Sequence, residues 1–397
     1  MIMSIKMNSN HDIVIVGVGM TPLGEHWDLS IRELALQAIS AARAEAPEIL
    51  PQAFYVANML APALSRQSQL GALLADFAGL RGIEALTVEA AGASGGAALR
   101  QAFLALKSGM VQSALVVGVE KVTDRVGAEV DAAMATMTDA DYEAVQGITP
   151  TAQAALLMRR YLHENGAPQD ALAGFSLNAH ANGATNPFAM FQKAIRLDQY
   201  IKAPMVSDPV NMFDASPIAD GAAALLLVNA DSIPSNVDNP LVKITASATS
   251  SSAVALHDQP DPLVINAAVV STRKALEQAN LTPDDIDIFE LHDAFTIISA
   301  LSLEAAGFAD RGEGWKLAAD GAIALDGKIP ISTFGGSKAR GEAGGATGVI
   351  QIVELVRQLQ GLAGKNQVTG AKIGMAQCLG GIGATAVTHI LTRLHGQ

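Results

Sequence analysis

The chain has 397 residues, of which 50% are hydrophobic and 4% aromatic, and its formal net charge is −13. This length and apolar content allow a large buried core divided over two or three domains. The acidic balance argues against a general nucleic-acid binder, because phosphate contacts need a basic face. A single cysteine, Cys378, excludes an internal disulfide and agrees with a reducing compartment.

The ends of the chain carry no export or membrane signal that we recognise. No apolar stretch of signal-peptide length precedes Ile13, so we expect a cytoplasmic location. Residues 373–392 lack Lys, Arg, Asp and Glu, but Gly, Gln, Thr and His interrupt them, which favours buried strands over a membrane span. The histidines show no spacing typical of metal ligands, so we expect no metal.

The first part of the chain alternates between predicted strands and helices. Residues 13–20 form a β-branched run, and the capping box Ser30 to Glu33 predicts a helix that continues to Ala44. Pro22 stands where a dinucleotide fingerprint needs its third glycine, which argues against NAD binding. Residues 115–120 and 222–230 are apolar enough for buried strands. Their alternation with helices predicts a sandwiched sheet with right-handed crossovers.

Two segments break this alternation. Residues 122–208 are more polar and irregular, with helices predicted at 151–164 and 168–182. Residues 229–240 (NADSIPSNVDNP) contain two prolines and several turn formers, which indicate a boundary. We therefore predict an N-terminal half over 1–236 and a C-terminal half over 237–397.

The second half repeats features of the first. Gly-Ala-Ser-Gly-Gly-Ala-Ala from Gly92 is echoed by Gly-Glu-Ala-Gly-Gly-Ala-Thr from Gly341, and each precedes an amphipathic helix. Residues 215–229 and 378–391 are likewise similar, as a glycine turn followed by an apolar strand. This weak duplication predicts two similar α/β halves.

Four separated segments carry a family resemblance. They are 88–100 (VEAAGASGGAALR), 291–295 (LHDAF), 335–348 (GGSKARGEAGGATG) and 377–385 (QCLGGIGAT). With them the chain resembles the thiolases, in particular the branch of the sterol-carrier-protein thiolases and archaeal acetoacetyl-CoA thiolases. The resemblance extends over almost the whole chain. It implies a duplicated five-layered α-β-α-β-α fold, with an inserted loop domain at about 122–208 that covers an acyl-CoA site.

Two positions depart from the family pattern. Gly92 stands at the position of the nucleophilic cysteine, and Glu342 replaces the histidine of the Gly-His-Pro motif. A glycine has no side chain to acylate, so a thioester intermediate at this position is chemically impossible. Loss of nucleophile and base together indicates a natural loss of thiolysis. Glu342 is either a replacement general acid or base, or a structural carboxylate neutralised by Arg340 or Lys338.

Other motif residues are retained. The resemblance places His292 in an oxyanion hole, Cys378 at the acid–base cysteine, and the backbone N–H groups of Gly92 and Gly380 in a second oxyanion hole. The alternative for Cys378 is a small buried apolar side chain. The substrate-binding positions implied in the same way are Ser94, His180, Asp293, Phe295 and Gly345.

Three functions are consistent with these residues. The first is retro-aldol or decarboxylative C–C bond chemistry on an acyl-CoA thioester, through a pocket that stabilises an enolate without acyl transfer. Cysteine-less relatives of this family act as aldolases, although they have tyrosine at the position of His292. The second is a catalytically silent subunit that binds acyl-CoA or scaffolds a small zinc-ribbon/OB-fold partner. The third is acetyl-CoA C-acyltransferase activity with Cys378 as a surrogate nucleophile.

These alternatives leave open whether the chain is an enzyme. The resemblance implies an acyl-CoA or acyl-pantetheine ligand and no further cofactor. It also implies a homodimer or a higher oligomer, with residues 114–119 near the interface.

Overall fold

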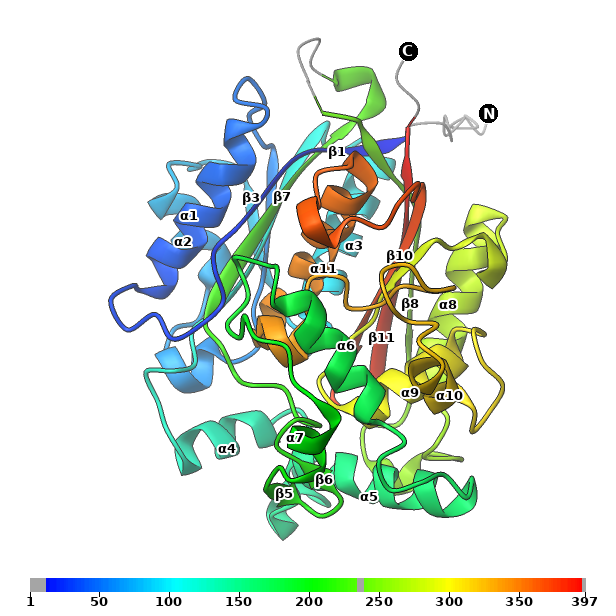
Figure 1. Ribbon diagram of the computed structural model, residues 1–397. Helices are drawn as coiled ribbons and strands as arrows, with labels where there is room; N and C mark the ends of the chain where they lie inside the picture. Colours follow the sequence, from blue (N-terminus) through cyan, green and yellow to red (C-terminus); the bar gives the residue numbers. More distant parts are fainter. Residues whose placement is uncertain (1–11, 234–238, 395–397) are drawn as a thin grey trace, which may run out of the picture.

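The computed structural model describes residues 12–233 and 239–394. Its strands are β1 (Ile13–Met20), β2 (Ala53–Ala57), β3 (Glu84–Val88), β4 (Ser113–Glu120), β5 (Met205–Ser207), β6 (Val210–Asn211), β7 (Gly221–Asn229), β8 (Val242–Ser251), β9 (Ile288–Glu290), β10 (Ile373–Gly380) and β11 (Thr385–Arg393). Its α-helices are α1 (Ile31–Ala44), α2 (Leu70–Phe77), α3 (Ser94–Lys107), α4 (Ala128–Ala135), α5 (Pro150–Glu164), α6 (Ala173–Gly183), α7 (Leu197–Ile201), α8 (Asn266–Ala279), α9 (Thr296–Ala305), α10 (Gly314–Ala319) and α11 (Thr347–Gln360). Figure 1 shows their arrangement.

The large sheet joins the two halves of the chain. Its strand order in the described residues is β3-β2-β4-β7-β1-β8-β11-β10-β9. β2 pairs in parallel with β3 and β4, and β9 pairs in parallel with β10, while the remaining neighbours are antiparallel. The halves meet where Ile13, Val14 and Ile15 of β1 pair with β8. The sheet is therefore mixed, and both halves contribute strands to it.

Helices lie between and outside the two half-sheets (Figure 1). The central helices α3 and α11 share a core cluster with strands of both halves, for example through Leu99, Val116, Ile244 and Val353. Helices α1 and α2 cover the outer face of the first half-sheet, and α8 and α9 cover the outer face of the second. This confirms the five-layered α-β-α-β-α arrangement. The glycine-rich repeats near Gly92 and Gly341 lead into the two central helices.

Local sequence signals explain several element boundaries. Ser30 Oγ accepts a hydrogen bond from Glu33 N, and the Glu33 carboxylate accepts one from Ser30 N, so the predicted capping box is present. Thr149 caps α5 with a single bond, because its Oγ1 accepts a hydrogen bond from Ala152 N. The helix predicted at 168–182 begins only at Ala173, because the chain first makes a turn in which Ala171 N donates to the carbonyl of Pro168.

The segment expected near a dimer interface is an inner strand of the sheet. Residues 114–119 belong to β4, which lies between β2 and β7 and is buried along its whole length. The free edge of the first half-sheet is β3, where Leu86 is 53% exposed. Pairing between two copies through this half-sheet would therefore use β3 and not β4.

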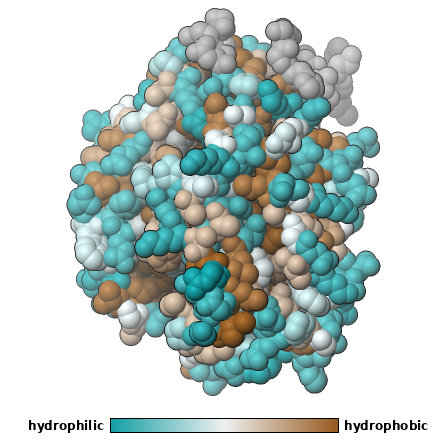
Figure 2. Space-filling model, in the orientation of Figure 1, coloured by the Kyte–Doolittle hydropathy of each residue, from teal (hydrophilic) through white to brown (hydrophobic). Residues whose placement is uncertain are grey.

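The surface is mixed in polarity on the face that Figure 2 shows, with hydrophobic side chains gathered in its lower part. There lie α7 and the β5–β6 hairpin, whose exposed apolar residues are Leu197, Ile201, Met205 and Val206. No helix within residues 12–233 and 239–394 is both long enough and apolar enough to cross a membrane.

Candidate active site

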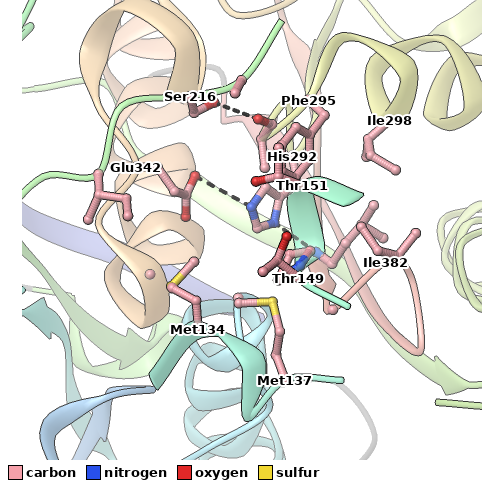
Figure 3. A pocket seen from close by; sticks show the side chains of 18 of the residues that line it. Met134, Met137, Thr149, Thr151, Ser216, His292, Phe295, Ile298, Glu342 and Ile382 are labelled. Carbon is pink, nitrogen blue, oxygen red and sulfur yellow. Dashed lines mark hydrogen bonds and ion pairs between the residues drawn. The ribbon is translucent and has the colours of Figure 1, made fainter. Parts of the chain in front are cut away.

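A cavity of about 160 Å³ lies where the two halves and the segment after β4 come together. Three methionines line it, Met59, Met134 and Met137, and Met134 and Met137 come from the irregular segment predicted to cover the site. The polar groups His292 and Glu342 lie close together in its wall (Figure 3). The cavity is thus mostly apolar, with His292 and Glu342 as a close polar pair and Asp131, Thr149, Thr151 and Ser216 as further polar residues in its lining.

The His292 side chain is held at the start of the loop between β9 and α9. Its Nδ1 accepts a hydrogen bond from Leu379 N at 3.2 Å, which assigns the ring proton to Nε2. Nε2 faces Glu342 Oε2 at 3.5 Å. Burial alone would lower the pKa of His292, but the Glu342 carboxylate raises it above its ordinary value. The imidazole therefore presents an N–H group to the carboxylate.

Glu342 is ionised and incompletely bonded. Thr347 Oγ1 donates to its Oε1 at 2.7 Å, whereas its buried Oε2 accepts no hydrogen bond from any described residue. Burial would raise the pKa of this carboxyl, but His292 and the hydrogen bonds lower it to about 2. Arg340 and Lys338 act on Glu342 through their charge and not through direct contact, because Arg340 pairs with Glu354 and Lys338 donates to the carbonyl of Asp214.

Gly92 lines the pocket directly beside the His292 imidazole. A Cβ atom built on Gly92 would lie 2.7 Å from His292 Cε1 and 2.7 Å from the carbonyl oxygen of Leu379. Real Cβ atoms do not approach other heavy atoms so closely, so any side chain here would require His292 or β10 to move. The position of His292 and the absence of a side chain at position 92 depend on each other.

Cys378 lies on the other face of β10. Its Sγ donates to Gln351 Oε1 at 3.0 Å and is enclosed by Ala93 and Val387. Burial raises the pKa of this thiol to about 12. Leu379 lines the pocket instead, because successive side chains of a strand point to opposite faces. An acid–base role for Cys378 would require the thiol to reach the pocket, and this structure does not bring it there.

Some of the residues predicted for the oxyanion hole and the substrate site line the pocket, and others do not. Phe295 lines the pocket, as expected, together with Gly92. Gly380 does not, and its neighbours Leu379 and Gly381 take its place in the wall. Ser94 Oγ accepts from Ala90 N and donates to the carbonyl of Ala91, so it fixes the turn before α3.

The remaining predicted binding residues lie behind the wall. Asp293 accepts hydrogen bonds from Ser337 N and Ser332 Oγ, which anchors the loop after β9. His180 packs its ring against Phe213 and Phe191. These two residues and Gly345 do not line the pocket.

Glu120, at the buried end of β4, was missed by the sequence analysis. Its carboxylate accepts hydrogen bonds from Asn58 Nδ2 and from the backbone N–H groups of Met59, Leu60 and Gly345. Burial raises the pKa of Glu120 to about 7, although these hydrogen bonds oppose the rise. The carboxylate thereby positions two stretches of the pocket wall. The signal in the sequence that could have identified Glu120 is an acidic residue at the end of an otherwise apolar strand.

Metal chemistry finds no support in the side-chain arrangement. Within residues 12–233 and 239–394, no group of three or more His, Cys, Asp or Glu side chains is placed to hold a metal ion. The pocket thus presents an imidazole N–H, the Glu342 and Asp131 carboxyl groups and the hydroxyl groups of Thr149, Thr151 and Ser216 within a mostly apolar lining.

The fold and this site define a member of the thiolase superfamily. The chain belongs to the thiolase family, since the thiolase N-terminal domain matches residues 13–231 and the thiolase C-terminal domain-like family matches residues 248–393. The acetyl-CoA acetyltransferase of Methanothermobacter thermautotrophicus is 43% identical over 386 residues, which cover 96% of this chain and 100% of that protein. The benzoylsuccinyl-CoA thiolase subunit BbsB of Thauera aromatica is 29% identical, with 92% of each chain covered.

Solved structures share the fold. The Ltp2-ChsH2(DUF35) aldolase superposes with a TM-score of 0.81 at 24% identity, covering 96% of this chain and 98% of that chain. Human mitochondrial 3-ketoacyl-CoA thiolase superposes with a TM-score of 0.72 at 19% identity, covering 97% and 99%. At these identities the likeness concerns the fold alone.

Proposed function

We propose that this protein cleaves the Cα–Cβ bond of a 3-hydroxyacyl thioester by a retro-aldol reaction, without forming an acyl-enzyme. One observation carries the proposal. Glu342 Oε2 is a buried, ionised acceptor in the pocket wall that faces His292 Nε2 in a long ion pair of 3.5 Å and accepts no hydrogen bond from the described residues. Such an acceptor can take a further, shorter hydrogen bond, and the hydroxyl group of a 3-hydroxyacyl thioester would supply the donor.

The chemistry follows from the two polar groups. As the Cα–Cβ bond breaks, the hydroxyl proton passes to Glu342, the C–O bond becomes C=O, and the electron pair stays on Cα as a thioester enolate. The His292 Nε2–H group stabilises the enolate oxygen. Glu342 then returns the proton to Cα, which releases the shortened thioester and an aldehyde or ketone. A carboxylate of low pKa suffices as base, because the hydroxyl becomes strongly acidic while the bond breaks.

The charge of the pocket favours this reaction over a decarboxylative one. Asp131 and Glu342 are among its lining residues, and none of the described lining residues is Lys or Arg. A substrate carboxylate at this place would be repelled by Glu342, and the one cationic group in the described lining, His292, is already paired with Glu342. A neutral hydroxyl meets no such penalty.

Acyl transfer is less well supported, although two curated relatives are named acetyl-CoA acetyltransferases. Gly92 offers no nucleophile, and the Cys378 thiol is sealed behind β10. The fold is compatible with aldolase chemistry, because one solved protein that shares it is named an aldolase.

The test is a cleavage assay on 3-hydroxyacyl-CoA thioesters with and without free CoA, followed by mass spectrometry of products and protein. We expect an aldehyde or ketone without added CoA and no acyl mass on the protein. Glu342→Gln should lower kcat/KM by roughly 100-fold or more. Glu129→Gln is the matched control, since Glu129 is an exposed carboxylate on α4 that pairs with Arg125.

Two outcomes contradict the proposal. CoA-dependent cleavage with acyl mass on Cys378 would make the protein an acyltransferase with a displaced nucleophile. Absence of turnover on all thioesters, combined with retained CoA-thioester binding, would make it a silent binding or scaffold subunit.

We also propose that the protein assembles with a second copy and with a small partner protein. The exposed edge of β3 supports pairing between copies, and the DUF35 component named with the Ltp2 aldolase supports the partner. Light scattering of the purified chain tests the first point. A mass corresponding to one chain over a range of protein concentrations would contradict it.

A further inference from the structure

We infer that the carbonyl compound released by this site is a compact, uncharged, apolar aldehyde or ketone, about the size of a benzene ring, and that Met134 and Met137 set this size. The inference rests on the proposed retro-aldol reaction. It concerns the substituent on Cβ, which must lie in the pocket beside Glu342 while the thioester oxygen lies at His292.

The volume of the cavity limits the substituent. An enclosed apolar cavity of about 150 Å³ holds benzene, and the pocket here, which is partly open, measures about 160 Å³. Because the reacting carbons need part of this space, a fused multi-ring group would have to extend through the opening or displace the wall, and we expect either to weaken binding.

The walls are apolar on two sides of the polar pair (Figure 3). Met134 and Met137 lie on one side, at the end of α4 and just beyond it, and Phe295, Ile298 and Ile382 lie on the other. Burying an apolar substituent between these side chains removes apolar surface from water and is favourable. The hydroxyl side chains of Thr149, Thr151 and Ser216 also line the pocket, but none of them carries a charge, so the pocket favours an uncharged substituent.

The methionines are the adjustable part of this wall. Both are partly buried and pack against a small cluster that includes Leu60, Val122 and Val130, separate from the main cores. Methionine is unbranched and fills irregular spaces, so these side chains can close on a small group. Shortening them enlarges the cavity without changing His292 or Glu342.

Charge sets the second limit. No described residue that lines the cavity is Lys or Arg, whereas Asp131 stands in the wall on α4. A carboxylate on the substituent would lose its hydration without gaining a partner. The released carbonyl compound is therefore uncharged.

The test uses 3-hydroxyacyl-CoA thioesters that differ only on Cβ: propyl, phenyl, 4-carboxyphenyl, naphthyl and a steroid-sized ring system. Wild-type kcat/KM should be highest for propyl and phenyl, and at least tenfold lower for the other three. The Met134→Ala/Met137→Ala variant should raise the naphthyl-to-phenyl ratio of kcat/KM at least tenfold. Met205→Ala, an exposed methionine on β5, should leave the ratio unchanged.

A binding series separates this inference from the reaction itself. The same thioesters without the 3-hydroxyl group cannot be cleaved, and their Kd values should follow the same order of size and charge. Cleavage or binding that is as strong for the steroid-sized or the carboxylated member as for phenyl would overturn the size and charge limits. If binding follows the order but no hydroxyl substrate is cleaved, the retro-aldol proposal fails while the stated pocket selectivity stands.

Discussion

The two faces of β10 differ more than their sequence neighbourhood suggests. On one face the backbone of Leu379 binds His292 and forms part of the pocket wall. On the other face the adjacent Cys378 is enclosed and bonded to Gln351. His292 and Cys378 both belong to segments that resemble catalytic motifs, yet the His292 side chain lines the cavity and the Cys378 side chain does not. A motif gives the position of a residue in the sequence, whereas the direction of its side chain depends on the face of the strand to which it belongs.

The largest expected effect tests this comparison directly. His292→Ala should lower kcat/KM for retro-aldol cleavage roughly 100- to 1000-fold, because the enolate oxygen loses its N–H donor. Cys378→Ser should change it less than about threefold, because the side chain faces away from the substrate. Steady-state kinetics on the same thioester gives both values. A loss for Cys378→Ser as large as that for His292→Ala would show that the thiol reaches the substrate.

A smaller effect concerns the contact between Gly92 and the imidazole. Gly92→Ala should destabilise the fold by about 1–3 kcal/mol, because the added methyl group overlaps His292 and the Leu379 carbonyl. In a His292→Ala background the penalty should shrink by about 0.5 kcal/mol or more. Urea unfolding of the four proteins measures this coupling. Equal penalties in both backgrounds would mean that His292 does not occupy the space beside position 92.

The dependence of stability on pH tests the ion pair. The pKa of Glu342 in the folded protein, about 2, lies below its ordinary value of 4.5, so the stability that this group contributes is complete above pH 4.5 and is lost as the pH falls toward 2. The raised pKa of His292 gives a contribution that is complete below 6.5 and is lost as the pH rises through the raised value.

We therefore expect the difference in free energy of unfolding between wild type and Glu342→Gln to be greatest between pH 4.5 and 6.5. Urea unfolding of both proteins over about pH 3 to 9 gives this difference. Groups other than Glu342 and His292 titrate in both proteins, so their contributions drop out when the two free energies are subtracted. A difference that does not vary with pH would exclude a stabilising ion pair.

The smallest effect is on the sealed face of β10. Because burial raises the pKa of Cys378 to about 12, iodoacetamide should label it in denaturant and leave it largely unmodified in the native protein at neutral pH. Cys378→Ser should lower stability by no more than about 1.5 kcal/mol. Rapid native labelling, followed by mass spectrometry, would show that the sulfur is accessible.

The sequence predicted the helices and strands from local patterns and the five layers from the family resemblance, but it did not predict the side-chain contacts of the site. Apolar periodicity and the Ser30 capping box indicated the elements, since these signals are local. The approach of His292 to Glu342 could not be derived from spacing, because the two lie on separate segments that only the tertiary fold brings together. The burial of Cys378 depends on which face of β10 its side chain occupies. The place of Met134 in the pocket lining depends on how the irregular segment after β4 packs against the rest of the fold.

The carboxylate of Glu120 has a consequence for how the molecule denatures. It binds Met59 and Leu60 of the first half of the chain and Gly345 of the second, and the sheet is continuous across β1 and β8. Melting the second half alone would remove the Gly345 donor from a carboxyl group left inside the first half, and melting the first half alone would remove β1 from its pairing with β8. Calorimetry should therefore record one cooperative heat-absorption peak for the whole chain, so the duplicated architecture behaves thermodynamically as an indivisible unit.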